Sequence, residues 1–117
     1  AFILDARSKG RFDATQPEPR AGIRGGHIPG SFSAPFQNFL DPKTGTILPV
    51  PVLKEAFLAV HPQLDKPGSS KIVYTCGTGV TAAITALAAH EAGFPDPIVY
   101  DGSWTEYGGL PNVPIEP

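Results

Sequence analysis

The chain has 117 residues, enough for one domain, and its 41% hydrophobic and 17% charged residues predict a folded protein rather than a disordered tail. Its net charge of −2 argues against a nucleic-acid-binding protein, and no apolar run approaches the roughly 20 residues of a membrane span. The single cysteine excludes an internal disulfide and a zinc site built from several cysteines.

Short apolar runs alternate with helix-favouring segments along the chain, a pattern typical of βαβ units around a parallel sheet. The expected strands are 2–6, 32–35, 71–75 and 98–100, and the expected helical segments are 8–12, 36–40, 52–61 and 81–92. Gly- and Pro-rich loops fill 15–30 and 41–51. We therefore expect an α/β domain: a small, mainly parallel sheet of about five strands with helices on both faces.

The loop between the strand 71–75 and the helix 81–92 has the sequence CGTGVT and contains the only cysteine, Cys76. Ligands of parallel α/β sheets bind beyond the carboxyl ends of the strands. Gly77 and Gly79 allow the backbone to curl so that several N–H groups point inward, next to the positive start of a helix. Such a cradle predicts a lowered pKa for Cys76 and a nucleophilic role, although a lone cysteine after a strand can also be a small buried hydrophobe.

Four stretches, in this order, resemble the rhodanese superfamily in its mercaptopyruvate sulfurtransferase branch. They are DARSKGRF at 5–12 followed by TQPEPR at 15–20, GHIPGS at 26–31, CGTGVTA at 76–82 and YDGSWTE at 100–106. The resemblance implies a single rhodanese-like domain over 1–117, of the catalytic, C-terminal type. It also implies that the chain is a fragment of a two-domain enzyme whose N-terminal rhodanese-like domain is missing.

The resemblance further implies a sulfurtransferase that moves sulfane sulfur from 3-mercaptopyruvate to a thiol acceptor such as thioredoxin, or to cyanide. Cys76 is then the nucleophile that becomes a persulfide, and the hydroxyl of Thr78 relays a proton beside it. Arg11 and Arg20 hold the substrate carboxylate and keto group, since a guanidinium binds a carboxylate bidentately. The implied substrate-binding residues are Arg11, Arg20, Gly77, Gly79, Val80 and Thr81.

The two residues after the cysteine bear on the choice of sulfur donor. In the family, enzymes that prefer thiosulfate carry Arg and Lys there, and two cations suit a dianion. Gly77 and Thr78 are neutral in this chain. The thiosulfate branch also lacks an arginine equivalent to Arg20. Both features favour 3-mercaptopyruvate, with a thiosulfate:cyanide sulfurtransferase as the alternative within the family.

Several residues near these motifs are expected to be structural. Asp5 and Arg7 are interpreted as a pair that orders the first loop, and His27 as a residue that hydrogen-bonds the backbone. Asp101 and Trp104 are expected to fix the last loop near the mouth of the site.

Two other classes remain to be separated from a sulfurtransferase. A cysteine phosphatase needs an arginine six positions after its cysteine, where this chain has Ala82. A non-catalytic rhodanese-like binding module stays open. We expect no metal or cofactor, because His27, His61 and His90 show no ligand spacing. A single cysteine fits a cytoplasmic or mitochondrial compartment better than secretion.

Overall fold

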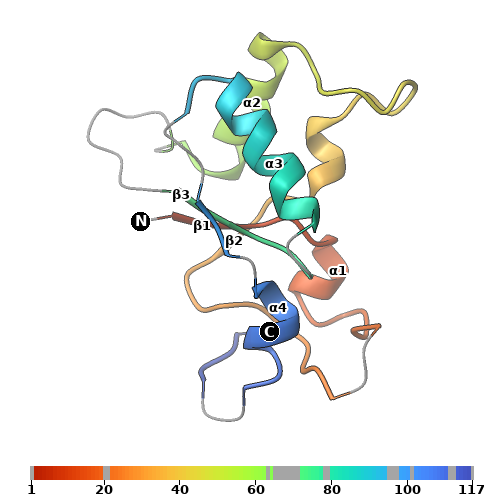
Figure 1. The fold of residues 1–117 in the computed structure, drawn as a ribbon, viewed down its shortest axis with the longest axis vertical. Coiled ribbons are helices and arrows are strands. Elements are labelled where there is room, and N and C mark those ends of the chain that lie inside the picture. Colours follow the sequence, from red (N-terminus) through yellow and green to blue (C-terminus); the bar gives the residue numbers. More distant parts are fainter. Residues whose placement is uncertain are drawn as a thin grey trace.

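Four parallel strands form the centre of the protein (Figure 1). The computed structural model describes residues 2–19, 22–62, 64, 72–77, 80–94, 98–100, 102–110 and 113–116. The strands are β1 (Phe2–Asp5), β2 (Phe32–Ser33), β3 (Ile72–Thr75) and β4 (Ile98–Val99), and their order in the sheet is β2-β1-β3-β4. All three strand pairs are parallel, so every crossover passes through helical or loop segments on the faces of the sheet.

The register brings the carboxyl ends of the central strands level with one another. Asp5, the last residue of β1, lies opposite Ser33 of β2 and Thr75 of β3. The amide of Ala6 then donates to the carbonyl of Thr75 at 2.7 Å, which extends the pairing one residue beyond the strands. The loops that follow β1 and β3 therefore leave the sheet side by side.

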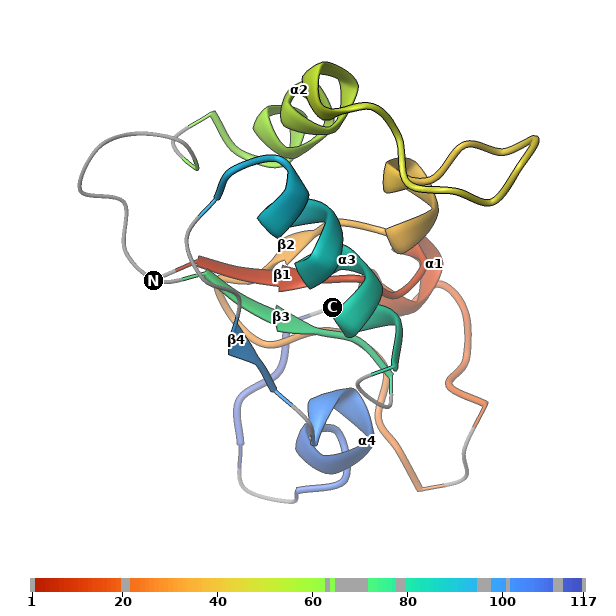
Figure 2. The same ribbon diagram turned by 45° about the horizontal axis from the view of Figure 1, so that its top comes forward.

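Helices cover the two faces of the sheet unequally (Figure 2). On one face lie α2 (Val50–Val60) and α3 (Val80–Glu91), and the 3-10 helix η1 (Phe36–Phe39) packs against both of them. On the other face lies the short helix α4 (Ser103–Tyr107) with the segment that follows it. The four-residue helix α1 (Lys9–Phe12) follows β1 at the carboxyl edge.

The core fills the space between the sheet and the helices α2 and α3. Its aromatic members pack ring against ring: Phe57 stacks on Phe39 at 4.2 Å and meets Phe94 at 5.2 Å between ring centroids. Small side chains on α3 let this helix approach the sheet closely, because Ala82, Ala86 and Ala89 are buried where longer side chains would hold it away.

The expected α/β class and parallel sheet are confirmed, with three differences. The described part of the chain contains four strands, where about five were expected. The helix expected at 52–61 begins two residues earlier, because Pro49 and Pro51 are compatible with a helix start. The helix α4 was not expected at all.

The predicted end of the alanine-rich helix is confirmed, since Gly93 follows it with a φ of 89°. Within the described ranges, no helix is long and apolar enough to cross a membrane.

A buried tyrosine of β3 generates a prediction about alkaline pH. Tyr74 is fully buried, its hydroxyl has no hydrogen-bond partner among the described residues, and burial raises its pKa far above the usual value. Above a pH of about 10, the unfolded chain loses this proton while the folded protein retains it, so the free energy of unfolding should fall. Tyr74→Phe should reduce this alkaline loss and add about 1–3 kcal/mol at neutral pH.

Urea denaturation at neutral pH and at a pH of about 11 measures both effects. Tyr107→Phe is the matched control, because the hydroxyl of Tyr107 donates to the carbonyl of Pro114 at 2.9 Å. This control should lose stability at neutral pH and keep the alkaline loss. A Tyr74→Phe variant that is less stable than the unmodified chain would contradict the assignment of an unsatisfied hydroxyl.

Candidate active site

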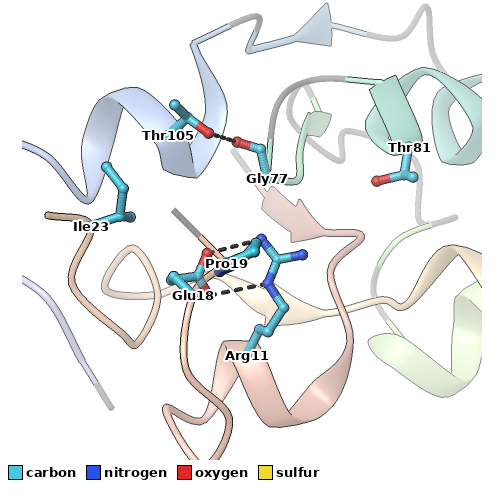
Figure 3. A pocket seen from close by; sticks show the side chains of 7 residues that line it. All are labelled: Arg11, Glu18, Pro19, Ile23, Gly77, Thr81 and Thr105. Atoms are coloured by element: carbon cyan, nitrogen blue, oxygen red, sulfur yellow. Dashed lines mark hydrogen bonds and ion pairs between the residues drawn. The ribbon is translucent and has the colours of Figure 1, made fainter. Parts of the chain in front are cut away.

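A pocket of about 280 Å³ opens where the loops after β1 and β3 emerge from the sheet (Figure 3). Its walls come from α1, from residues 18, 19 and 23, from residue 77, which follows β3, from the start of α3 and from helix α4. The lining residues are Arg11, Glu18, Pro19, Ile23, Gly77, Thr81 and Thr105. The carboxyl edge of the sheet therefore holds the pocket, as the sequence predicted.

Cys76 lies directly after β3 and is 1% exposed. It does not line the described pocket, whereas its neighbour Gly77 does. The amide of Cys76 donates to the hydroxyl of Ser103 at 3.1 Å, and its carbonyl accepts from the amide of Trp104 at 2.8 Å. The carbonyl of Gly77 accepts from Thr105 twice, from the amide at 2.9 Å and from the hydroxyl at 2.6 Å. Helix α4 thus fastens the first two residues of the cysteine loop.

Ser103 reaches the cysteine amide by adopting an unusual backbone conformation. Its φ is 48°, in the left-handed region that side chains rarely occupy, and it is fully buried. The same hydroxyl donates to the carbonyl of Tyr100 at 2.7 Å, so it bridges the segment before α4 and the cysteine loop. The sequence alone gave no sign of this bridge.

Arg11 reaches the pocket from α1, and its local structure follows from the sequence. Ser8 caps this helix by accepting from the amide of Arg11. The guanidinium packs on Gly77 so closely that a Cβ on this glycine would lie 2.8 Å from Nη2 of Arg11. The absence of a side chain at Gly77 is therefore what lets Arg11 approach the cysteine loop.

Glu18 holds the same guanidinium. Its carboxylate accepts from Nη2 of Arg11 at 2.8 Å and from Nε at 3.1 Å. It also accepts from Nη1 of Arg7 at 3.3 Å, and its side chain is 3% exposed. Arg7 in turn forms a bidentate pair with Asp5 at 2.7 to 3.1 Å. The predicted Asp5–Arg7 pair is thus confirmed as one half of a four-residue chain of alternating charges.

The charges around Arg11 favour its protonated form still further. The pKa of Arg11 is raised, first by the hydrogen bonds that it donates to Glu18, and burial opposes this rise. The negative charges of Glu18, Asp5 and the Cys76 thiolate raise the pKa further. Because this attraction is mutual, Arg11 also stabilises the thiolate form of Cys76.

The structure brings together three of the predicted site residues and leaves three outside its described part. Arg11, Gly77 and Thr81 line one pocket, and Val80 is the first residue of α3. The residues outside the described ranges are Arg20, Thr78 and Gly79, and also Asp101. The other lining residues, Glu18, Pro19, Ile23 and Thr105, were missed. Of these four residues, only Glu18 could have been identified from the sequence, because it is an acidic residue in the Pro-rich segment that follows Arg7 and Arg11.

Two residues expected to be structural have the predicted kind of contact. His27 pairs through Nδ1 with the carbonyl of Phe12 at 2.8 Å and stacks on the Phe12 ring at 3.7 Å. Trp104 is 1% exposed and donates from Nε1 to the carbonyl of Arg24 at 2.7 Å. Among the residues that the structure describes, no cluster of three or more His, Cys, Asp or Glu side chains is placed to hold a metal ion.

A family model described as a rhodanese-like domain matches residues 1–109. The chain belongs to this rhodanese-like family. The fold of this rhodanese-like domain is similar to the crystal structure of Tum1 from Saccharomyces cerevisiae, with a TM-score of 0.78 and 40% identity over 91% of this chain and 36% of that one. It is equally similar to 3-mercaptopyruvate sulfurtransferase from Leishmania major, with a TM-score of 0.78 and 33% identity over 98% of this chain and 31% of that one.

A plant relative is similar over nearly the whole sequence. The domain is 52% identical over 113 residues to "Thiosulfate/3-mercaptopyruvate sulfurtransferase 1, mitochondrial" of Arabidopsis thaliana, a match that covers 97% of this chain and 28% of that protein. The chain thus spans about a third of the length of these relatives.

The strained serine of the rhodanese-like domain yields a prediction. Ser103→Ala removes a hydrogen bond from the buried Cys76 amide, so it should lower the free energy of unfolding by about 1–3 kcal/mol. Ser103→Gly removes the same hydroxyl but adopts a positive φ without steric cost. It should therefore be more stable than Ser103→Ala by about 1 kcal/mol. Urea denaturation of the two variants measures the difference, and a glycine variant less stable than the alanine variant would contradict the strain at Ser103.

Proposed function

We propose that this rhodanese-like domain transfers sulfur from 3-mercaptopyruvate, through a persulfide on Cys76, to a thiol or cyanide acceptor. The observation that carries the proposal is the packing of Arg11 on Gly77. It places one permanent cation beside the cysteine loop, at a position where a side chain on residue 77 would obstruct it. One cation suits the single carboxylate of 3-mercaptopyruvate. The relatives named above for this activity support the same donor.

The proposed reaction has two steps. In the first, the Cys76 thiolate attacks the sulfur of 3-mercaptopyruvate, an S–S bond forms, and the C–S bond breaks. The bonding electrons pass to carbon as the enolate of pyruvate, which takes up a proton and leaves. In the second, the acceptor attacks the outer sulfur of the persulfide and the Cys76 thiolate departs. Arg11 and Arg20 hold the carboxylate and keto group, the backbone from Gly77 to Thr81 stabilises the negative sulfur, and Thr78 relays the proton.

The contacts of Arg11 define how it can bind a carboxylate. Its Nε and Nη2 atoms are bound by Glu18, so the substrate meets the outer end of the guanidinium, which includes Nη1. The substrate carboxylate therefore does not bind Nε, as it would in a side-on bidentate pair with Nε and Nη2. The part of the pocket that Thr81 and Gly77 line receives the donor.

Thiosulfate as the sulfur donor is the second candidate, and the names of two relatives favour it. One is the plant protein named for both donors, and the other is "Thiosulfate sulfurtransferase TUM1" of Saccharomyces cerevisiae, 43% identical over 113 residues. A non-catalytic module is the third candidate. It is less well supported, because the chain retains Cys76 and a cation beside its loop.

Three further proposals concern the domain context, the sulfur acceptor and the compartment. We propose that the chain is the catalytic, C-terminal domain of a two-domain enzyme, and that a thiol protein such as thioredoxin accepts the sulfur. The proposed compartment is cytoplasmic or mitochondrial, and the name of the plant relative includes the mitochondrial location.

Steady-state kinetics with both donors test the proposal. The chain should use 3-mercaptopyruvate with a higher kcat/KM than thiosulfate. Cys76→Ser should abolish transfer from both donors, because a serine hydroxyl is not ionised near neutral pH. Arg20→Ala should lower kcat/KM for 3-mercaptopyruvate about 10- to 150-fold, the equivalent of one charge-assisted hydrogen bond, and should affect thiosulfate less. Transfer by a folded Cys76→Ser variant, or a preference for thiosulfate, would overturn the assignment.

Gly77 provides a separate test of donor choice. Gly77→Ala places a methyl group 2.8 Å from Nη2 of Arg11, so the guanidinium must shift away from the cysteine loop. We expect kcat/KM for 3-mercaptopyruvate to fall about tenfold, with a smaller loss for thiosulfate. Changing Gly77 to Arg and Thr78 to Lys should move the preference toward thiosulfate.

Gly109→Ala is the matched control for Gly77→Ala, because a Cβ at Gly109 meets no atom closer than 3.4 Å. It should leave the ratio of the two donors unchanged. An equal loss for both donors in Gly77→Ala would show that the close approach of Arg11 does not select the donor.

A further inference from the structure

The charged side chains that line the described pocket form a single ion pair. Arg11 is the cation and Glu18 is the anion, joined by two hydrogen bonds of 2.8 and 3.1 Å. The Glu18 side chain is 3% exposed and that of Arg11 is 27% exposed. The carboxylate is thus less exposed than the guanidinium that it binds, and an incoming anion meets a cation that has a negative charge 2.8 Å from its Nη2 atom.

The charges behind this pair cancel as well. Glu18 also binds Arg7, and Arg7 binds Asp5, so the chain of four contains two arginines and two carboxylates. Its net charge is zero. A neutral group of charges gives a short-range preference for one carboxylate at the guanidinium, and little long-range attraction for a compact dianion.

Glu18 also fixes the direction of the guanidinium. It binds Nε and Nη2, which leaves Nη1 on the opposite side, and Figure 3 shows this third nitrogen pointing away from Glu18 toward the side of Thr81. A carboxylate held at two nitrogens restricts rotation of the whole guanidinium plane. The orientation of the cation offered to the donor is therefore set by Glu18 rather than by the substrate.

We propose that Glu18 is a specificity-determining residue, which positions Arg11 and, through its charge, favours a monoanionic α-keto acid donor over a dianionic donor. This inference rests on the proposed sulfur transfer and names the residue that sets its donor class. A purely structural Glu18, which only joins the loop 15–19 to α1, would affect stability but leave the ratio between donors unchanged.

The first test compares donors in Glu18→Gln, which keeps the size of the side chain and removes its charge. The ratio of kcat/KM for thiosulfate to kcat/KM for 3-mercaptopyruvate should rise on the order of tenfold, since the group of four then carries one excess positive charge. Glu55→Gln is the matched control, because Glu55 is exposed on α2 and the change in net charge is identical. Glu55→Gln should leave the ratio unchanged. An unchanged ratio in active Glu18→Gln overturns the inference and leaves the proposed function standing.

The second test does not depend on sulfur transfer. Cys76 is the only cysteine in the sequence, so its alkylation can be followed by intact mass without interference. Iodoacetate carries one negative charge and iodoacetamide carries none, and the ratio of their rates cancels the reactivity of the thiolate itself. In Glu18→Gln this ratio should rise several-fold, and in Glu55→Gln it should not change. An unchanged ratio overturns the role of the Glu18 charge. A risen ratio in a protein that transfers no sulfur supports that role and overturns the proposed function alone.

Glu18→Asp separates position from charge and serves if Glu18→Gln does not fold. It keeps the negative charge but is one methylene too short to contact both arginines as Glu18 does. We expect the iodoacetate to iodoacetamide ratio of the unmodified chain together with a KM for 3-mercaptopyruvate raised about tenfold and a smaller change in kcat. A KM equal to that of the unmodified chain would overturn the positioning role.

Discussion

The guanidinium of Arg7 is the group on which the arrangement of the pocket depends. It is fully buried, and removing such a cation from water costs several kcal/mol unless its donors are satisfied. Asp5 at the end of β1, the carbonyl of Gly26 at 2.7 Å and the carboxylate of Glu18 accept from it, and the ring of Trp104 lies 4.5 Å away. These partners come from four places in the sequence, at residues 5, 18, 26 and 104. The buried guanidinium of Arg7 therefore connects the segments that surround the pocket.

Two sets of contacts connect the pocket walls to the cysteine loop. From one side, α4 binds the amide and carbonyl of Cys76 and the carbonyl of Gly77. From the other side, Arg11 rests on Gly77 and is held there by Glu18. The first two residues of the cysteine loop are thus held by neutral hydrogen bonds with α4 and by a cation whose direction is fixed. A group transferred at this position meets preorganised dipoles and one guanidinium, which suits a reaction that places negative charge on sulfur.

The sequence predicted the parts of this architecture that local patterns encode. The strand at 72–75, the alanine-rich helix with Gly93 shortly after its end and the Asp5–Arg7 pair were expected and are present. The helix α4 was missed because its five residues include no helix-favouring periodicity, and it is stabilised by contacts with the cysteine loop. Glu18 was missed as a member of the site for a related reason. Its role depends on two arginines, 7 and 11 residues away, that only the fold brings to one carboxylate.

The central claim is that Cys76 carries sulfur taken from a mercapto keto acid. The most direct measurement is the intact mass of the 117-residue chain after it is mixed with 3-mercaptopyruvate and separated from small molecules. The account predicts a gain of one sulfur atom, removed by a thiol reductant, with pyruvate released in equal amount. No gain in mass, or the same gain in the Cys76→Ser variant, would contradict it.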